Sequence, residues 1–254
     1  MRNTKPIILV ACALACSQAV RAQESRKVDD REARRLIREF DKAVKSKQSS
    51  LSSRLTSVNN LGKSSNGLFV KPLLRTARSD SAKSVRQAAA LAIGNQPAKQ
   101  ARSALQLLLK KTSITSEPNV TAAIIKAIDK SSYQAKDYKT FKSLFERSLA
   151  DQRCVAAQIA ILEMFGHHKE VEAAQYLSMH IDAPAPAWVD DPSNPPASYW
   201  EARYKNWQKW RNQLKEALFQ ITGQRFASNK EARAWLKKNR NKLKKRRTRK
   251  STKK

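Results

Sequence analysis

The stretch VRQAAALAIG, residues 85–94, decides the fold. It places small apolar side chains at helical spacing, so it predicts a short helix. Alanine combines the highest helix propensity with a side chain small enough for two helix backbones to approach closely. We therefore expect this helix to lie between two neighbouring helices.

The same pattern returns twice, each time after an interval of 35 residues. VTAAIIKAID follows at residue 120 and VAAQIAILEM at residue 155. In the third copy Glu163 falls where an aliphatic residue is expected, and the apolar set reads better as Val155, Ile159, Leu162 and Phe165. The valines that open the three copies are Val85, Val120 and Val155.

A second series of amphipathic stretches runs between these helices at the same interval. It consists of FVKPLLRTAR, ARSALQLLLKK and YKTFKSLFERSLA, which contain Leu74, Leu109 and Leu144. An earlier, degenerate unit is REARRLIREFDKAVK with LSSRLTSVNNLG, and KEVEAAQYLSMHI closes the series. Helix pairs at a fixed period indicate a solenoid, because one pair cannot cover its own apolar face. The predicted fold class is all-α, an α-solenoid of stacked antiparallel helix pairs, with essentially no sheet.

VRQAAALAIG followed by PAKQARSALQLLLKK resembles the second helix of one HEAT repeat and the first helix of the next. The Val85-Arg86 pair, the alanine-rich centre and the terminal Gly94 carry the resemblance, which covers about residues 31–181. Thr121 and Ala156 stand in the later units where Arg86 stands in the first, so the inward arginine ladder of that family is mostly absent. The resemblance implies a curved helical scaffold that usually binds other macromolecules, although such folds host a few enzymes.

The first 22 residues, MRNTKPIILVACALACSQAVRA, have the order of a secretory signal peptide. Their apolar run is too short for a membrane-spanning helix, which needs roughly 20 residues. We expect cleavage after Ala22, with lipoprotein processing at Cys16 as the alternative. The mature chain would then be exported, to the periplasm or the extracellular space, without a transmembrane segment.

The mature chain divides into four parts: repeats at 23–181, a connector at 182–197, aromatic helices at 198–241 and a tail at 242–254. The connector is rich in proline and lacks helical periodicity. Its Trp188 is expected to pin it against the repeats.

A long helix is expected from about Ala197 to Thr222, and a capping box from Ser228 to Glu231 opens another. Because a solenoid needs its last apolar face covered, we interpret these two helices as a cap. The run ITGQRFASNKEARAWLKKNRN resembles a closing segment of exported bacterial HEAT-repeat proteins. The aromatic and apolar face of the first helix comprises Trp200, Tyr204, Trp207, Trp210, Leu214, Leu218 and Ile221.

Residues for catalysis or metal binding are scarce. His167 and His168 with Glu170 suggest a metal site, but adjacent histidines point to different sides of a helix. Cys154 would be the one cysteine of the mature chain, and in the apolar run CVAAQIAILEMF it reads as a small buried hydrophobe. We therefore predict no catalytic residue, no cofactor and no metal site, and we do not expect an enzyme.

The net charge at pH 7 is +30, and its density is highest at the C-terminus, where residues 237–254 carry 12 lysines and arginines and no acid. Dense like charge with almost no apolar content cannot pack, so the chain is expected to be disordered beyond about Leu243. Such a segment binds polyanions by counterion release, without regard to sequence. The candidate polyanion-binding residues are Lys237, Lys238, Arg240, Lys242, Lys244, Lys245, Arg246, Arg247, Arg249, Lys250, Lys253 and Lys254.

Two functions fit this reading. The first is a non-enzymatic scaffold that holds a partner protein, while the tail tethers the complex to an anionic polymer or a membrane surface. The alternative is a protein that binds nucleic acid or an anionic polysaccharide with its cationic body as well, since residues 23–236 hold 36 basic residues against 21 acids. An enzyme of the helical-repeat DNA glycosylase kind receives little weight, because export would separate it from the chromosome.

Overall fold

The computed structural model describes residues 25–46, 49–186 and 191–251. This part of the chain is all-α, with 75% helix, eleven α-helices and contacts mostly between neighbouring helices. The predicted signal peptide, including Cys16, lies outside the described residues, as does Trp188 of the connector. None of the helices in the described ranges combines the length and the apolar character that a membrane span requires.

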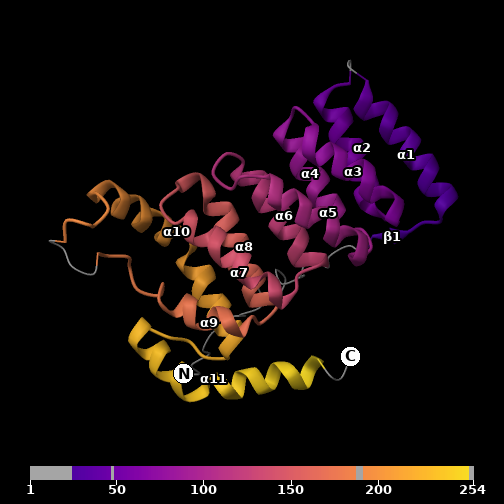
Figure 1. Ribbon diagram of the computed structural model, residues 1–254. Helices are drawn as coiled ribbons and strands as arrows, with labels where there is room; N and C mark the ends of the chain where they lie inside the picture. The colour runs from indigo at the N-terminus through magenta and orange to yellow at the C-terminus, as the bar shows by residue number, and fades with distance from the viewer. Residues whose placement is uncertain (1–24, 47–48, 187–190, 252–254) are drawn as a thin grey trace, which may run out of the picture.

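The helices alternate between two layers, and α1 and α11 lie at opposite ends of the molecule (Figure 1). In the even-numbered layer each helix packs on the next, from α2 through to α10. That layer comprises α2 (Leu51–Lys63), α4 (Lys83–Ile93), α6 (Pro118–Ser131), α8 (Val155–His167) and α10 (Ala197–Thr222). The odd-numbered helices are α1 (Asp30–Lys45), α3 (Val70–Ser79), α5 (Ala98–Lys111), α7 (Tyr138–Arg147), α9 (Val171–Ser178) and α11 (Asn229–Ser251). Three 3-10 turns, η1 (Gly67–Phe69), η2 (Ala135–Asp137) and η3 (Gln152–Cys154), precede α3, α7 and α8.

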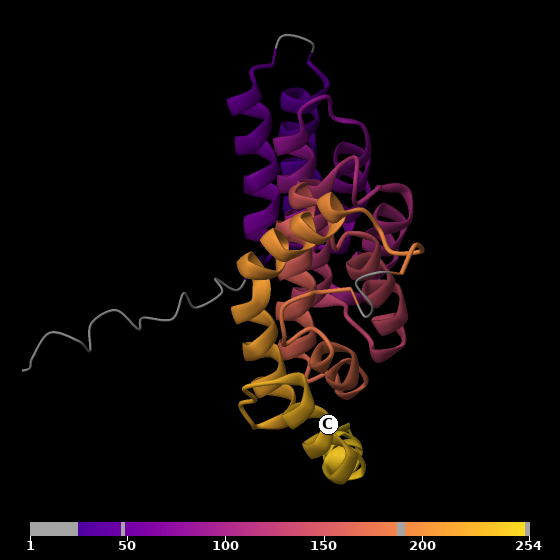
Figure 2. The same cartoon turned by 90° about the vertical axis from the view of Figure 1, so that its left-hand side faces the viewer.

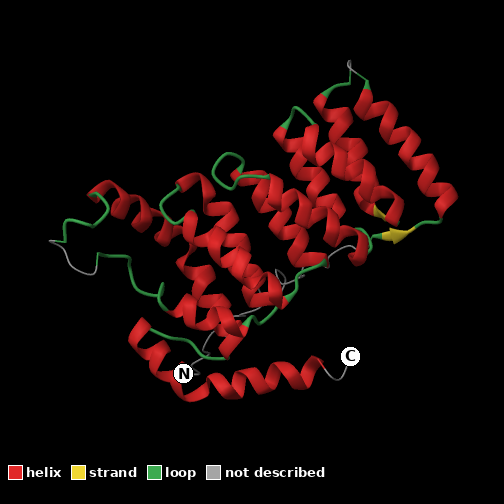
Figure 3. Ribbon diagram, in the orientation of Figure 1, coloured by secondary structure: helices red, strands yellow, loops and turns green. Residues whose placement is uncertain are grey.

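The described residues contain one very small sheet, in agreement with the expectation of essentially no sheet. Strands β1 (Arg26–Lys27) and β2 (Ser64–Ser65) pair in parallel, with Arg26 opposite Ser64 (Figure 3). The pairing arises because the chain before α1 runs past the end of α2. There the amide nitrogen of the Asn66 side chain donates a hydrogen bond to the carbonyl oxygen of Val28 at 3.1 Å.

The buried positions agree with the predicted 35-residue interval at its first step and differ from it at the second. Val85 and Val120 are buried, but Val155 is only half-buried. Cys154, one residue earlier, is fully buried, and Gln158 is buried in place of Ile159. The third helix is therefore set one residue earlier than the 35-residue interval predicts. Of the predicted apolar set, only Leu162 and Phe165 are fully buried.

Small residues are found where the even-numbered helices approach most closely. A Cβ atom added to Gly94 would lie 2.8 Å from the Cα atom of Ala127 on α6. A Cβ atom added to Gly62 would lie 3.0 Å from the Cβ atom of Ala92 on α4. These contacts are the reason that an alanine-rich helix fits between two neighbours.

The C-terminal region confirms the long helix and differs from the prediction in the tail. Helix α10 has the predicted bounds, and Trp207, Trp210, Leu214, Leu218 and Ile221 on its apolar face are buried. At its N-terminal end Trp200 is half-buried and Tyr204 is 42% exposed. The described backbone of α11 is helical to Ser251, whereas the sequence predicts disorder beyond about Leu243. Lysine and arginine have high helix propensity, and cations near a helix C-terminus complement the macrodipole.

Candidate polyanion-binding interface and neighbouring clusters

The first half of α11 is anchored to the body of the protein. Ala232, Leu236 and Leu243 are buried, and α11 packs on α9. The backbone N–H of Asn229 donates to the carboxylate of Asp182 at 3.2 Å. Glu231 completes a variant of the predicted capping box. Its N–H donates a hydrogen bond to Ser228 Oγ at 3.3 Å, and its carboxylate accepts one from the backbone N–H of Ala227.

The predicted cations on the anchored half are mostly exposed. Lys237, Lys238 and Lys242 lie at the surface without an ion pair to any other described residue. Arg240 instead contacts Glu172 on α9 at 3.1 Å and helps to hold α11 in place. Figures 1 and 2 both show α11 at one end of the molecule.

The remaining candidates continue along the same helix. Only the helical backbone is described for Lys244, Lys245, Arg246, Arg247, Arg249 and Lys250, and Lys253 and Lys254 lie outside the described residues. The sequence contains no apolar residue after Leu243. The last two turns of α11 therefore lack the kind of side chain that anchors the first half.

The cations of the body are distributed unevenly between the layers. Helix α8 contains no lysine or arginine, and α4 and α6 contain four between them. Two of those four are engaged, because Arg86 pairs with Glu117 and Lys130 Nζ lies 2.6 Å from Asn95 Oδ1. The odd-numbered helices α1, α3, α5 and α7 carry three to six cations each, and α10, at the end of the even-numbered layer, carries five. The three central helices of the even-numbered layer, α4, α6 and α8, are therefore poor in cations.

His167 and His168 converge on one carboxylate, although adjacent histidines were expected to diverge. His167 Nδ1 lies 2.8 Å from Asp129 Oδ2, and His168 Nε2 lies 2.9 Å from Asp129 Oδ1. The two rings can meet because α8 ends at His167 and His168 leaves the helical path. Glu170 is occupied elsewhere, since its carboxylate accepts a hydrogen bond from the Tyr133 hydroxyl at 2.8 Å.

This cluster joins α6 to α8 electrostatically. The hydrogen bond that His168 donates to the Asp129 carboxylate raises the pKa of His168 above its ordinary value of 6.5, although burial opposes the shift. Burial raises the pKa of Asp129, but hydrogen bonds from both histidines outweigh it and leave the pKa below 3.8. No group of three or more histidine, cysteine or acidic side chains in the described ranges is placed to hold a metal ion.

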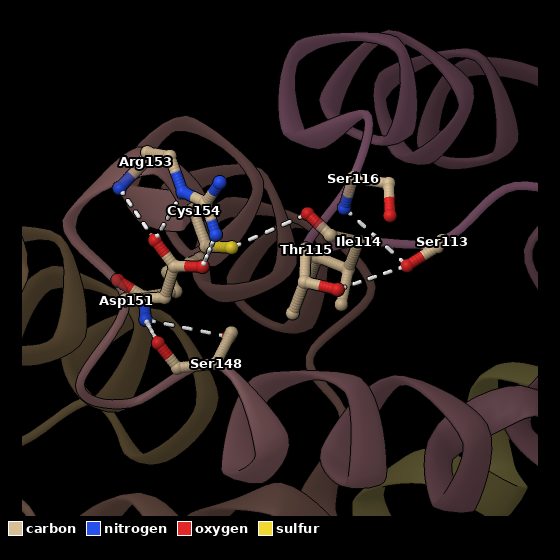
Figure 4. A network of polar contacts seen from close by, with 9 residues as sticks. Ser113, Ile114, Thr115, Ser116, Ser148, Asp151, Arg153 and Cys154 are labelled. Atoms are coloured by element: carbon tan, nitrogen blue, oxygen red, sulfur yellow. Dashed lines mark hydrogen bonds and ion pairs between the residues drawn. The ribbon is translucent and has the colours of Figure 1, made fainter.

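Cys154 lies in a polar network that joins two turns (Figure 4). Its Sγ atom donates a hydrogen bond to the carbonyl oxygen of Ile114 at 3.3 Å. Burial, followed by the charge of Asp151, raises the pKa of the Cys154 thiol to about 11. A thiol with that pKa stays protonated near neutral pH and is a poor nucleophile. The cysteine therefore acts here as a packed, hydrogen-bonded side chain.

Sequence reasoning missed a cavity of about 1050 Å³ between α5 and α7. Its lining includes Leu107 and Lys110 from α5 and Arg147 from α7. The sequence contains only a weak signal for this cavity, because Lys110 and Arg147 lie in the last turns of their helices, where cations are common. Only the spacing of the two helices shows that they border one cavity.

Searches with the chain match no protein-family model, no curated protein and no solved structure.

Proposed function

We propose that this protein is a non-enzymatic, HEAT-like scaffold, exported from the cell, which holds a partner protein and is tethered electrostatically by α11. One observation carries the tether: an acid-poor helix is anchored through its first half and presents exposed Lys237, Lys238 and Lys242. The scarcity of cations on α4, α6 and α8 favours a protein over a polyanion as the partner of that layer.

The spacing of the polar contacts supports a HEAT-like repeat. The side-chain amide of Asn95 donates to the carbonyl oxygen of Gly62 at 2.8 Å, across 33 residues. Lys130 donates to the Asn95 side chain across 35 residues. The first contact joins the end of α4 to α2, and the second joins α6 to the end of α4. Such contacts are expected where every helix pair packs on its neighbours.

Two arginines also support the resemblance. Arg54 on α2 lies 3.5 Å from Asp80, and Arg86 on α4 pairs with Glu117. In both pairs the arginine reaches an acid close to the start of the next even-numbered helix. The pair between Arg54 and Asp80 was not predicted from the sequence. No such pair follows on α6, where Thr121 stands in place of the arginine.

The tether is tested by binding to heparin, a sulfated polysaccharide, at a series of salt concentrations. Replacing Lys237, Lys238 and Lys242 by glutamine should lower the salt dependence of the affinity by roughly two to three ions, because fewer counterions are released. The control variant replaces three exposed lysines elsewhere, Lys71, Lys83 and Lys139, and has the same net charge. Equal losses in the two variants would show that α11 is not the tether.

The cationic odd-numbered helices favour a second function, polyanion binding over the whole body. That function predicts substantial heparin or oligonucleotide binding after deletion of residues 237–254, whereas the tether predicts that almost all binding is lost. The same deletion therefore separates the two functions in one titration.

Export is supported by the sequence of the first 22 residues. We expect the protein isolated from its own cells to begin at Gln23, as read from the mass of its N-terminal peptide. A lipid-modified N-terminus at Cys16 would identify a lipoprotein instead. A chain that still begins at Met1 would contradict export by this segment.

A further inference from the structure

The odd-numbered layer is interrupted between α5 and α7. Helix α5 packs on α3 and α7 contacts α9, but α5 and α7 scarcely touch each other. Their N-terminal ends are clamped by Arg102, whose guanidinium contacts both carboxylate oxygens of Asp137 at 2.8 and 2.9 Å and also donates to the carbonyl oxygen of Ser132. The opening between α5 and α7 lies toward their C-terminal ends.

A groove of about 1050 Å³ fills this opening. The lining residues span Gln106 to Thr112 along α5 and Thr140 to Arg147 along α7. At a rise of 1.5 Å per residue each wall is roughly 10 Å long, about two helical turns. The lining comprises Gln106, Leu107, Leu109, Lys110, Thr112, Ser113, Ile114, Thr115, Thr140, Leu144 and Arg147.

The floor of the groove is held in place by hydrogen bonds. Ile114 is 5% exposed, and its carbonyl oxygen accepts the bond from Cys154 Sγ (Figure 4). Ser113 Oγ lies 3.0 Å from Thr115 Oγ1 and accepts a bond from the N–H of Ser116 at 3.4 Å. A ligand would therefore meet a preformed surface, which lowers the entropic cost of binding.

The lining combines apolar surface with positive charge. Four aliphatic residues contribute to it, and one of them, Leu107, is 37% exposed. Lys110 and Arg147 supply the charge, and the lining includes no acid. The Nε2 atom of Gln106 is buried without a hydrogen-bond acceptor among the described residues. No aromatic ring lines the groove, so a nucleic-acid base would lack the aromatic surface on which bases usually stack.

We propose that this groove binds an acidic amphipathic segment of a partner protein. Apolar side chains of the segment would cover Leu107, and its carboxylates would pair with Lys110 and Arg147. Helix dipoles explain cations in the last turns of α5 and α7, but they do not explain an exposed leucine in the same lining. The inference rests on the proposed role as a protein-binding scaffold and names its binding site.

The test uses displayed peptides of about 16 residues, roughly four helical turns. The library fixes leucines at helical spacing and varies the other positions with a bias toward aspartate and glutamate. Peptides selected on the full chain are then titrated against L107D and against the double variant K110E/R147E. We expect their affinity to fall about tenfold or more in both variants.

The chain offers matched controls. Leu91 on α4 is 44% exposed and lies outside the groove, so L91D controls for an added charge at an exposed leucine. Lys99 on α5 is exposed and lies outside the lining, so K99E controls for charge reversal. Peptide affinity should be unchanged in both, and circular dichroism with thermal unfolding checks that every variant is folded at the temperature of the titration.

Three results would overturn the proposal: no selected peptide above background, equal binding by the groove variants, or displacement of the peptide by a single-stranded oligonucleotide at the same salt concentration. The last result would assign the groove to polyanions. The heparin titration with the Lys237, Lys238 and Lys242 variant tests the tether separately, because the two sets of substitutions do not overlap.

Discussion

An added methyl group has no room at Gly94, because the backbone and Cβ of Ala127 lie within 3.1 Å of the position it would occupy. G94A should destabilise the protein by about 1 to 3 kcal/mol through overpacking. The higher helix propensity of alanine recovers at most about 1 kcal/mol. Urea unfolding measures the difference. The control is G67A, where the added atom would be 3.4 Å from the flexible side chain of Gln100. An equal effect of both substitutions would contradict the argument.

The contact between His168 and Asp129 predicts a dependence of stability on pH. The pKa of His168 is raised in the folded protein, chiefly by its hydrogen bond to Asp129. Its contribution to stability is therefore fully present below about pH 6.5 and is lost as the pH rises through the higher folded-state pKa. Because the pKa of Asp129 is lowered, the contribution of that carboxylate is present above about pH 3.8 and is lost as the pH falls through the folded-state pKa.

The measurement compares the free energy of unfolding of the wild type and of D129N between pH 5 and pH 9. The difference between the two proteins should be largest at the acidic end of this range and should shrink as His168 loses its proton. Tyr133, Glu170 and His167 also face this cluster, so the comparison is made as a difference between two proteins that share them. A difference that is constant with pH would show that the ionised pair adds nothing.

At the scale of the helix, Arg102 is the clearest tie between neighbouring elements. Its contact with Asp137 joins α5 to the start of α7, and both side chains are at most 20% exposed. R102A leaves a largely buried carboxylate without its partner and should cost about 2 to 3 kcal/mol. R102K should fall in between, because an ammonium cannot make the two parallel bonds. The control is R35A, because the side chains of Arg35 and its partner Glu39 are over half exposed. Chemical denaturation should show that R35A lowers the free energy of unfolding by less than about 1 kcal/mol.

The sequence predicts single elements better than it predicts their spacing. The predicted bounds of α10 agree with the structure, because aromatic periodicity, a preceding proline and a following glycine define both ends. The sequence predicts Val155 as the buried residue that follows Val120, because Val155 is apolar and fits the 35-residue interval. In the structure the buried residue is Cys154, one position earlier. Helical propensity outweighed charge repulsion in the backbone beyond Leu243. The groove was missed because it depends on how far α5 lies from α7, and no periodicity in either helix encodes that distance.

At the scale of the whole molecule, a stack and a single globular core predict different responses to local damage. Among the described residues each even-numbered helix packs on the next, and most contacts run between neighbouring helices. In such an arrangement, stability approximates a sum of terms between neighbours. A defect at one end should therefore open that end and leave the other protected.

Phe40 on α1 and Leu214 on α10 are suitable probes, because they are buried at opposite ends of the stack. F40A should cost about 3 to 5 kcal/mol and L214A about 2 to 5 kcal/mol, through lost burial and a cavity. Hydrogen exchange read by mass spectrometry should show faster exchange in α1 to α3 for F40A, with α8 and α10 close to the wild type. L214A should give the reverse pattern. If either substitution accelerates exchange equally along the chain, one cooperative core holds the molecule together, and the HEAT-like stack is the wrong description of it.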